Sequence, residues 1–157
     1  MRKNHLLQLF IFLTVITPIL SFSQTEIQGK LMASIDANGR QILKQDYLNF
    51  LKNEFLTSDY CKEGWGDGNA PEKMQKACQE AHDKMVSMTQ DESSMAWMKP
   101  FHFKFATVNQ DLISYQFEQN VELNREATLS CSISLEFQAS RDKKLISKPF
   151  FDLYCDH

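Results

Sequence analysis

Apolar residues occupy every second position through most of the chain from Phe101 to Cys155, and this pattern constrains the fold more than any other. The intervening positions are mostly polar, so the pattern predicts antiparallel strands with one buried and one solvated face. Turn-forming residues interrupt it at 109–111, 124–126 and 140–142, which divides it into a four-stranded meander. The alternating apolar residues are Phe101, Phe103, Phe105, Ile113, Tyr115, Phe117, Val121, Leu123, Leu129, Cys131, Ile133, Leu135, Phe137, Phe151, Leu153 and Cys155.

The positions of the turns predict which residues lie opposite one another on neighbouring strands. We expect the first turn to centre on Gln110, the second on Arg125 and the third near Lys143. Each of these registers keeps the apolar residues on one face, and a slip by one residue would break that arrangement. The expected pairs are Phe105 with Tyr115, Phe103 with Phe117, Phe117 with Ile133, Tyr115 with Leu135, Leu135 with Phe151, Ile133 with Leu153 and Cys131 with Cys155.

The chain has four cysteines, Cys61, Cys78, Cys131 and Cys155. In an oxidising compartment an even number of cysteines predicts disulfides, and four cysteines allow three connectivities. The sheet register favours a Cys131–Cys155 bridge across two strands, which leaves Cys61 to pair with Cys78. The rival is a bridge between a helix and the sheet, such as Cys78–Cys131.

The first half of the chain has helical periodicity. One helix is expected over 42–55, after a break at Asn38-Gly39, and a second is expected to begin near Pro71. Residues 27–35 fit either a strand or a helix. The sequence therefore predicts a two-layer α+β fold, in which two helices pack on one face of the four-stranded antiparallel sheet. The order of elements resembles the cystatin-like and nuclear-transport-factor-2-like folds, a resemblance of architecture that implies no function.

The first 23 residues have the features of an export signal. A basic start at Arg2 and Lys3 precedes an almost unbroken apolar run over 6–20, and small residues at Ser21 and Ser23 precede Gln24. We predict a cleaved signal peptide over residues 1–23, a single disulfide-containing domain over 24–157, and a periplasmic or secreted protein.

The net charge of the chain limits the kinds of partner that it is expected to bind. The complete chain has 17 basic and 20 acidic residues, and removing the signal leaves 15 and 20, a net charge of −5. This balance argues against binding to nucleic acid or to an anionic membrane surface. The sequence also lacks the motifs of the common hydrolases, metalloproteases and nucleotide-binding enzymes. We therefore expect a non-catalytic protein without a cofactor.

The function that best fits these features is that of an inhibitor or immunity-type protein whose partner is a protein, such as a basic toxin or hydrolase. The candidate binding residues lie in the glycine-rich segment between the helices: Trp65, Asp67 and Glu63. The alternative is a carrier that encloses a small apolar ligand between the helices and the sheet, among Phe103, Phe105, Tyr115 and Phe117.

A further alternative is a soft-metal site for Cu(I) or Ag(I). His82, Met85 and Met88 recur at three-residue spacing on the second helix, and Met98 follows after a short interval. Thioether and imidazole groups are suitable ligands for these ions. Because methionine is also a common core residue on helices, packing is the favoured interpretation of this group.

Overall fold

The computed structural model describes residues 35–63, 71–90, 95–123 and 130–156. It has an α+β fold, as predicted from the alternation, and the four strands form one open antiparallel sheet in the order β1-β2-β3-β4. The elements in chain order are α2 (Ala37–Phe50), which continues as a π-helical turn (Leu51–Phe55), α3 (Asp59–Glu63), α4 (Pro71–Ser87), a 3-10 turn (Ala96–Met98), β1 (Phe101–Asn109), β2 (Leu112–Val121), β3 (Ser130–Ser140) and β4 (Phe150–Asp156).

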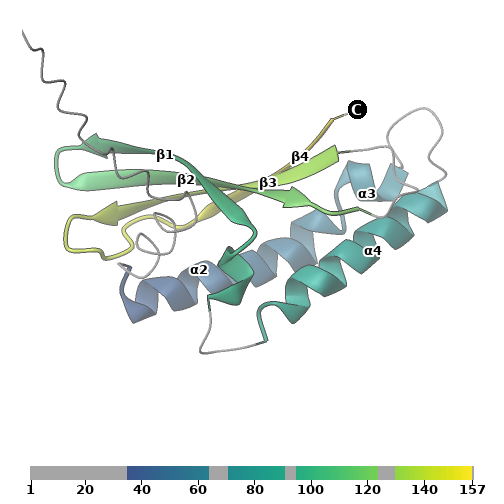
Figure 1. Ribbon diagram of the computed structural model, residues 1–157, viewed down its shortest axis with the longest axis horizontal. Coiled ribbons are helices and arrows are strands. Elements are labelled where there is room, and N and C mark those ends of the chain that lie inside the picture. The colour runs from purple at the N-terminus through teal and green to yellow at the C-terminus, as the bar shows by residue number, and fades with distance from the viewer. Residues whose placement is uncertain (1–34, 64–70, 91–94, 124–129, 157) are drawn as a thin grey trace, which may run out of the picture.

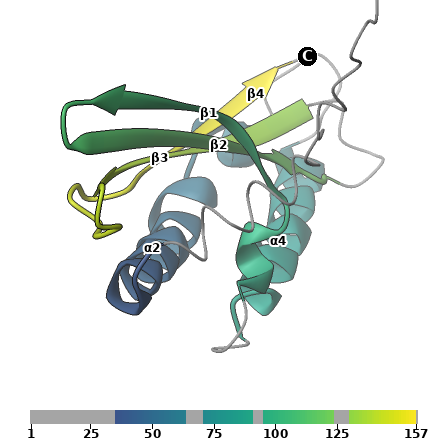
Figure 2. The same ribbon diagram turned by 60° about the vertical axis from the view of Figure 1, so that its left-hand side comes forward.

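The described helices lie on one side of the sheet and leave its other side uncovered by them (Figures 1 and 2). The face toward the helices is called the inner face, and the opposite face is called the outer face. The inner face carries buried residues from every strand, such as Phe101, Phe117, Leu135 and Phe151. None of the described helices is long and apolar enough to cross a membrane.

The first helix begins earlier than its sequence predicts. Asp36 is its N-cap, because the Asp36 carboxylate accepts a hydrogen bond from the backbone N–H of Gly39 at 2.6 Å. Asn38 and Gly39 therefore lie inside the first turn, and the expected break at these residues was wrong. A Cβ atom at position 39 would lie 2.8 Å from Ile35 and 3.2 Å from Leu145. Glycine is needed here because the helix approaches its neighbours closely.

The second long helix begins at Pro71, as predicted, and its stripe of small and apolar residues is buried. Met74, Ala77, Cys78, Ala81 and Met85 recur at intervals of three or four residues and face the core. The segment 27–34, whose sequence fits either a strand or a helix, lies outside the described residues, as does the proposed signal peptide.

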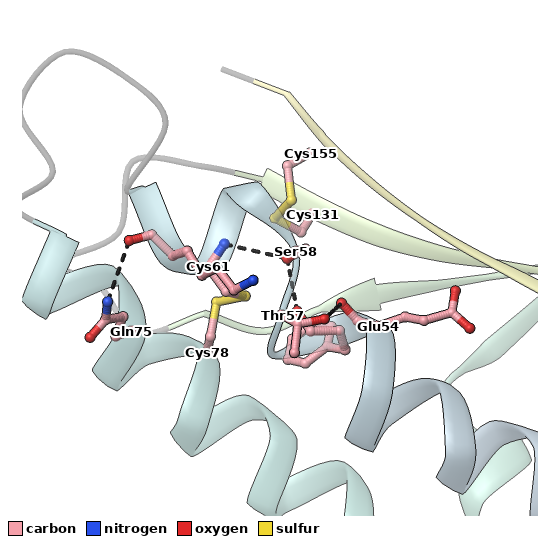
Figure 3. Close-up of a disulfide and its surroundings, with 10 residues drawn as sticks. Glu54, Thr57, Ser58, Cys61, Gln75, Cys78, Cys131 and Cys155 are labelled. Atoms are coloured by element: carbon pink, nitrogen blue, oxygen red, sulfur yellow. Dashed lines mark hydrogen bonds between the residues drawn. A yellow bond between two sulfur atoms is a disulfide. The ribbon is translucent and has the colours of Figure 1, made fainter.

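Both preferred disulfides are confirmed. Cys61 of α3 is bonded to Cys78 of α4, and Cys131 of β3 is bonded to Cys155 of β4. The two bridges lie at the same end of the molecule, near α3 (Figure 3). In a loop-entropy estimate, each bridge stabilises the fold by about 3 kcal/mol, mainly by restricting the unfolded chain.

The third hairpin has the predicted register, with Cys131 opposite Cys155 and Leu135 opposite Phe151. The second hairpin differs from the prediction by two residues, since Phe117 pairs with Leu135 and not with Ile133. The predicted turn centre was displaced by one residue, which moves every pair by two. A shift by two preserves the side-chain face, so the inner face stays apolar in spite of the error.

The first hairpin contains a β-bulge that the alternation of apolar residues does not predict. Phe103 pairs with Phe117 as predicted, but Phe105 pairs with Gln116 and not with Tyr115. Lys104 is the extra residue on β1, and an extra residue reverses the faces of the residues that follow it. The expectation that Phe105 lies on the inner face is therefore wrong.

A buried polar pair joins the helices to the sheet. The Tyr47 hydroxyl of α2 donates a hydrogen bond to Oε1 of Gln119 on β2 at 3.0 Å, and both side chains are buried. The Tyr47 ring also stacks on Trp97, with ring centroids 5.0 Å apart. Burial raises the pKa of the Tyr47 hydroxyl above its usual value, an effect that outweighs the lowering by the Gln119 hydrogen bond. The hydroxyl is thus held in its neutral form.

Candidate binding surface on the outer face of the sheet

One row of side chains crosses the outer face from edge to edge. Phe105 pairs with Gln116, Gln116 with Glu136, and Glu136 with Phe150. Directly paired residues in an antiparallel sheet project to the same face, so these four side chains lie side by side. The bulge at Lys104 is what places Phe105 in this row.

An open groove of about 330 Å³ follows this row. Phe105 and Phe150 stand at its two sides and are 56% and 60% exposed. With strands spaced roughly 4.8 Å apart, the two phenylalanines are separated by about 14 Å across the sheet. Polar residues form the floor between them and the end of the groove: Ser114, Gln116, Glu136, Gln138, Ser147 and Lys148. The groove thus combines apolar sides with a floor that can donate and accept hydrogen bonds.

Strand β4 extends this surface along one edge of the sheet. Its outer-face residues alternate between aromatic and acidic: Phe150, Asp152, Tyr154 and Asp156. Tyr154 is 61% exposed. The residues that pair with the last three on β3 are serines, Ser134, Ser132 and Ser130. Because serine side chains are short, the larger β4 side chains have no bulky neighbour on that side.

Charges on the outer face are only partly compensated. Lys104 Nζ lies 2.5 Å from a carboxylate oxygen of Glu118. This contact, assisted by a hydrogen bond from Ser132, lowers the pKa of Glu118, while partial burial opposes the shift. Two acidic residues of β4, Asp152 and Asp156, and Glu136 on the neighbouring strand form no ion pair within the described part of the chain.

The binding residues expected from the glycine-rich segment are not brought to this surface by the described structure. Glu63 is exposed at the last residue of α3, in the helical layer. Trp65 and Asp67 lie outside the described residues, so their role as binding residues stays a prediction.

The proposed soft-metal residues are distributed between the core and the surface. Met85 and Met98 are buried in the hydrophobic core. His82 Nδ1 lies 3.0 Å from a carboxylate oxygen of Asp83, and Met88 lines a small cavity of about 70 Å³ between α4 and β2. Among the described residues, no group of three His, Cys, Asp or Glu side chains is placed to hold a metal ion. The packing of Met85 and Met98 agrees with their interpretation as core residues.

The four aromatic residues that the carrier hypothesis placed around one ligand are divided between the two faces. Phe117 is fully buried and stacks on Phe137, while Phe103 meets the edge of the Phe117 ring. Phe105 lies on the outer face, on the opposite side of the sheet. The aromatic residues near the inner face therefore pack against one another, and Phe105 does not join them.

The exposed aromatic residues of β4, Phe150 and Tyr154, do not belong to the alternating apolar positions and were therefore not predicted as a surface. A usable signal was present in the dipeptide Phe150-Phe151. Successive residues of a strand point to opposite faces, so one of two adjacent phenylalanines must project away from the core. Tyr154, adjacent to both Leu153 and Cys155, follows the same rule.

Comparisons with known protein families, curated proteins and solved structures give no match to this chain. Its function must therefore be inferred from its own surface.

Proposed function

We propose that this chain is an exported, non-catalytic binding protein of the inhibitor or immunity type, which acts by contact with another protein through the outer face of its sheet. The observation that carries the proposal is the exposure of three large aromatic side chains, Phe105, Phe150 and Tyr154, on this face. Aromatic residues contribute strongly to binding at protein interfaces, and their exposure in water is unfavourable without a partner.

The scaffold supports this function because it is held rigid. Two disulfides join α3 to α4 and β3 to β4, which limits the freedom that a binding surface would lose on association. The disulfides are consistent with a periplasmic or extracellular protein. The net charge of −5 after signal removal favours a basic partner, such as a toxin or hydrolase.

The proposal can be tested with the oxidised chain 24–157 as bait in the periplasm or culture medium of the source cells. Quantitative mass spectrometry is expected to find a protein retained in stoichiometric amount. Retention should be lost with the double variant Phe105→Ser/Phe150→Ser, because both sides of the groove are then removed.

The matched control is Ile42→Ser, which removes an exposed apolar side chain from α2 in the helical layer. This variant should retain the partner as the original chain does. The proposal would be contradicted if Phe105→Ser/Phe150→Ser retained the partner as well as the original chain does. It would also be contradicted if native mass spectrometry showed a bound small molecule in place of a protein.

A further inference from the structure

We infer that strand β4 binds an extended, positively charged segment of the partner, which adds to the sheet as a fifth strand beside Phe150–Asp156. This inference rests on the proposed function and specifies the kind of segment that the outer face accepts. An extended peptide that joins a sheet edge gains backbone hydrogen bonds, and its alternate side chains reach the two faces of the sheet.

Strand β4 is suited to this role because its free edge is regular. All seven of its residues pair with β3 in an uninterrupted register. In the described structure no strand pairs with its other edge, since β4 is the last strand of an open sheet. The backbone N–H and C=O groups on that edge can therefore form a new ladder.

The opposite edge of the sheet is less suitable. Strand β1 contains the bulge at Lys104, which interrupts the regular spacing of backbone groups. The charge of Lys104 is also already paired with Glu118. Bulges and lysines are devices that protect edge strands from pairing, and β4 has neither within its bounds.

The charge of the occupant follows from the outer-face side chains of β4 and its neighbour. Along β4, Asp152 lies between the exposed rings of Phe150 and Tyr154, and Asp156 follows Tyr154 on the same face. Glu136 of β3 is the direct partner of Phe150. A lysine or arginine of the incoming segment can form an ion pair with Asp152 while its aliphatic stem or guanidinium plane packs on an aromatic ring. The short serines of β3 leave room for such a side chain.

A second copy of this chain fits the same edge poorly. Antiparallel pairing of two β4 strands about a two-fold axis would bring both copies of Asp152 and Asp156 into one short ladder. Like charges placed opposite or diagonally across strands repel one another. A basic segment compensates these carboxylates, whereas a second β4 strand adds to them.

The test uses the oxidised chain 24–157, which contains every described element, and a phage-displayed library of random linear peptides. We expect selected peptides to carry Lys or Arg at alternate positions among β-branched or aromatic residues. Their binding should slow hydrogen exchange at alternate amides of β4, measured by NMR, because these amides become bonded to the new strand.

Charge variants identify the contact. Titration calorimetry is expected to show about threefold to fivefold weaker binding for Asp152→Asn, and at least about tenfold weaker binding for Asp152→Lys. Glu54→Gln is the matched control, because it removes one exposed carboxylate from the helical layer and should leave the affinity unchanged.

The inference would be overturned if the library gave no enrichment of basic peptides, or if peptide binding slowed hydrogen exchange at amides of β1 or the helices and not of β4. It would also be overturned if Asp152→Lys bound the peptides as tightly as the original chain. A dimer joined through β4, seen by sedimentation, would also overturn it. A further contradicting result would be that the β4 amides are already protected from hydrogen exchange in the free chain and lose this protection when residues 24–34 are removed. If the natural partner is retained by Asp152→Lys but lost with Phe105→Ser/Phe150→Ser, the inference fails while the proposed function stands.

Discussion

The two faces of the sheet use the same residue type in opposite ways. On the inner face Phe117 is fully buried beneath the helices, whereas on the outer face Phe105 and Phe150 are more than half exposed. All three phenylalanines belong to strands of one sheet, so their strand propensity does not distinguish them. The difference comes from the direction of each side chain relative to the helices. A buried phenylalanine contributes to stability, and an exposed one is available for binding.

The largest expected difference between the two faces is in the free energy of unfolding of two matched Phe→Ala variants. Phe117→Ala should lower the free energy of unfolding by about 3–5 kcal/mol, because it opens a cavity beside Phe103 and Phe137. Phe105→Ala should lower it by less than about 1 kcal/mol, since the ring is already largely in water. Denaturant unfolding of the oxidised proteins measures both values. Similar losses for the two variants would show that the faces do not differ in this way.

A smaller effect is expected at the polar contact beneath the inner face. Tyr47→Phe should lower the stability by about 1–3 kcal/mol, because the buried Gln119 carbonyl loses its donor. Tyr154→Phe on the outer face is the control and should change the stability by less than about 0.5 kcal/mol.

The Tyr47 substitution should also change the response to alkali. Because the pKa of Tyr47 is raised in the folded state, its contribution to stability is complete below its ordinary value of 10.0 and is lost as the pH rises above that value. Stability measured across this alkaline range should therefore fall less steeply in Tyr47→Phe than in the original chain. Identical slopes would contradict the burial of the hydroxyl.

The smallest effect should come from the ion pair on the outer face. Lys104→Met should change the stability by less than about 1 kcal/mol near neutral pH, because both partners are substantially exposed. The pKa of Glu118 is lowered in the folded chain, so its contribution is present above the ordinary value of 4.5 and is lost as the pH falls through the lowered value. NMR titration of the Glu118 carboxyl should show the pKa rising in Lys104→Met, and an unchanged pKa would exclude Lys104 as the main cause of the shift.

Much of the fold could be predicted because strand periodicity is a local property. The alternation around Cys131 and Cys155 predicted both the third register and the disulfide that joins its strands. The helix that begins at Pro71 was likewise visible from its own apolar stripe. By contrast, the start of the first helix was missed, because Gly39 was interpreted as a helix break. A side chain at this position would collide with Ile35 and with the Asp36 cap, and it would also crowd the distant Leu145, a crowding that local spacing does not reveal.

The candidate site was predicted less well than the fold. The expected binding residues Trp65 and Asp67 lie outside the described residues, and the surface proposed here uses Phe105 and strand β4 in their place. The exposed position of Phe150 was available from its adjacency to Phe151. The exposed position of Phe105 could not be predicted in this way, because it depends on the bulge at Lys104.

The sequence by itself determined the α+β class, the four strands and the pairing of the cysteines, because these depend on residue spacing along short segments. Only the tertiary structure decided that Phe105 joins Phe150 across the outer face and that Tyr47 meets Gln119 in the core. The physical reason is that a bulge reverses the facing of every residue that follows it. The alternation along β1 does not show where the bulge falls, and the Tyr47–Gln119 contact joins residues 72 positions apart in the sequence, so neither is encoded in one short segment.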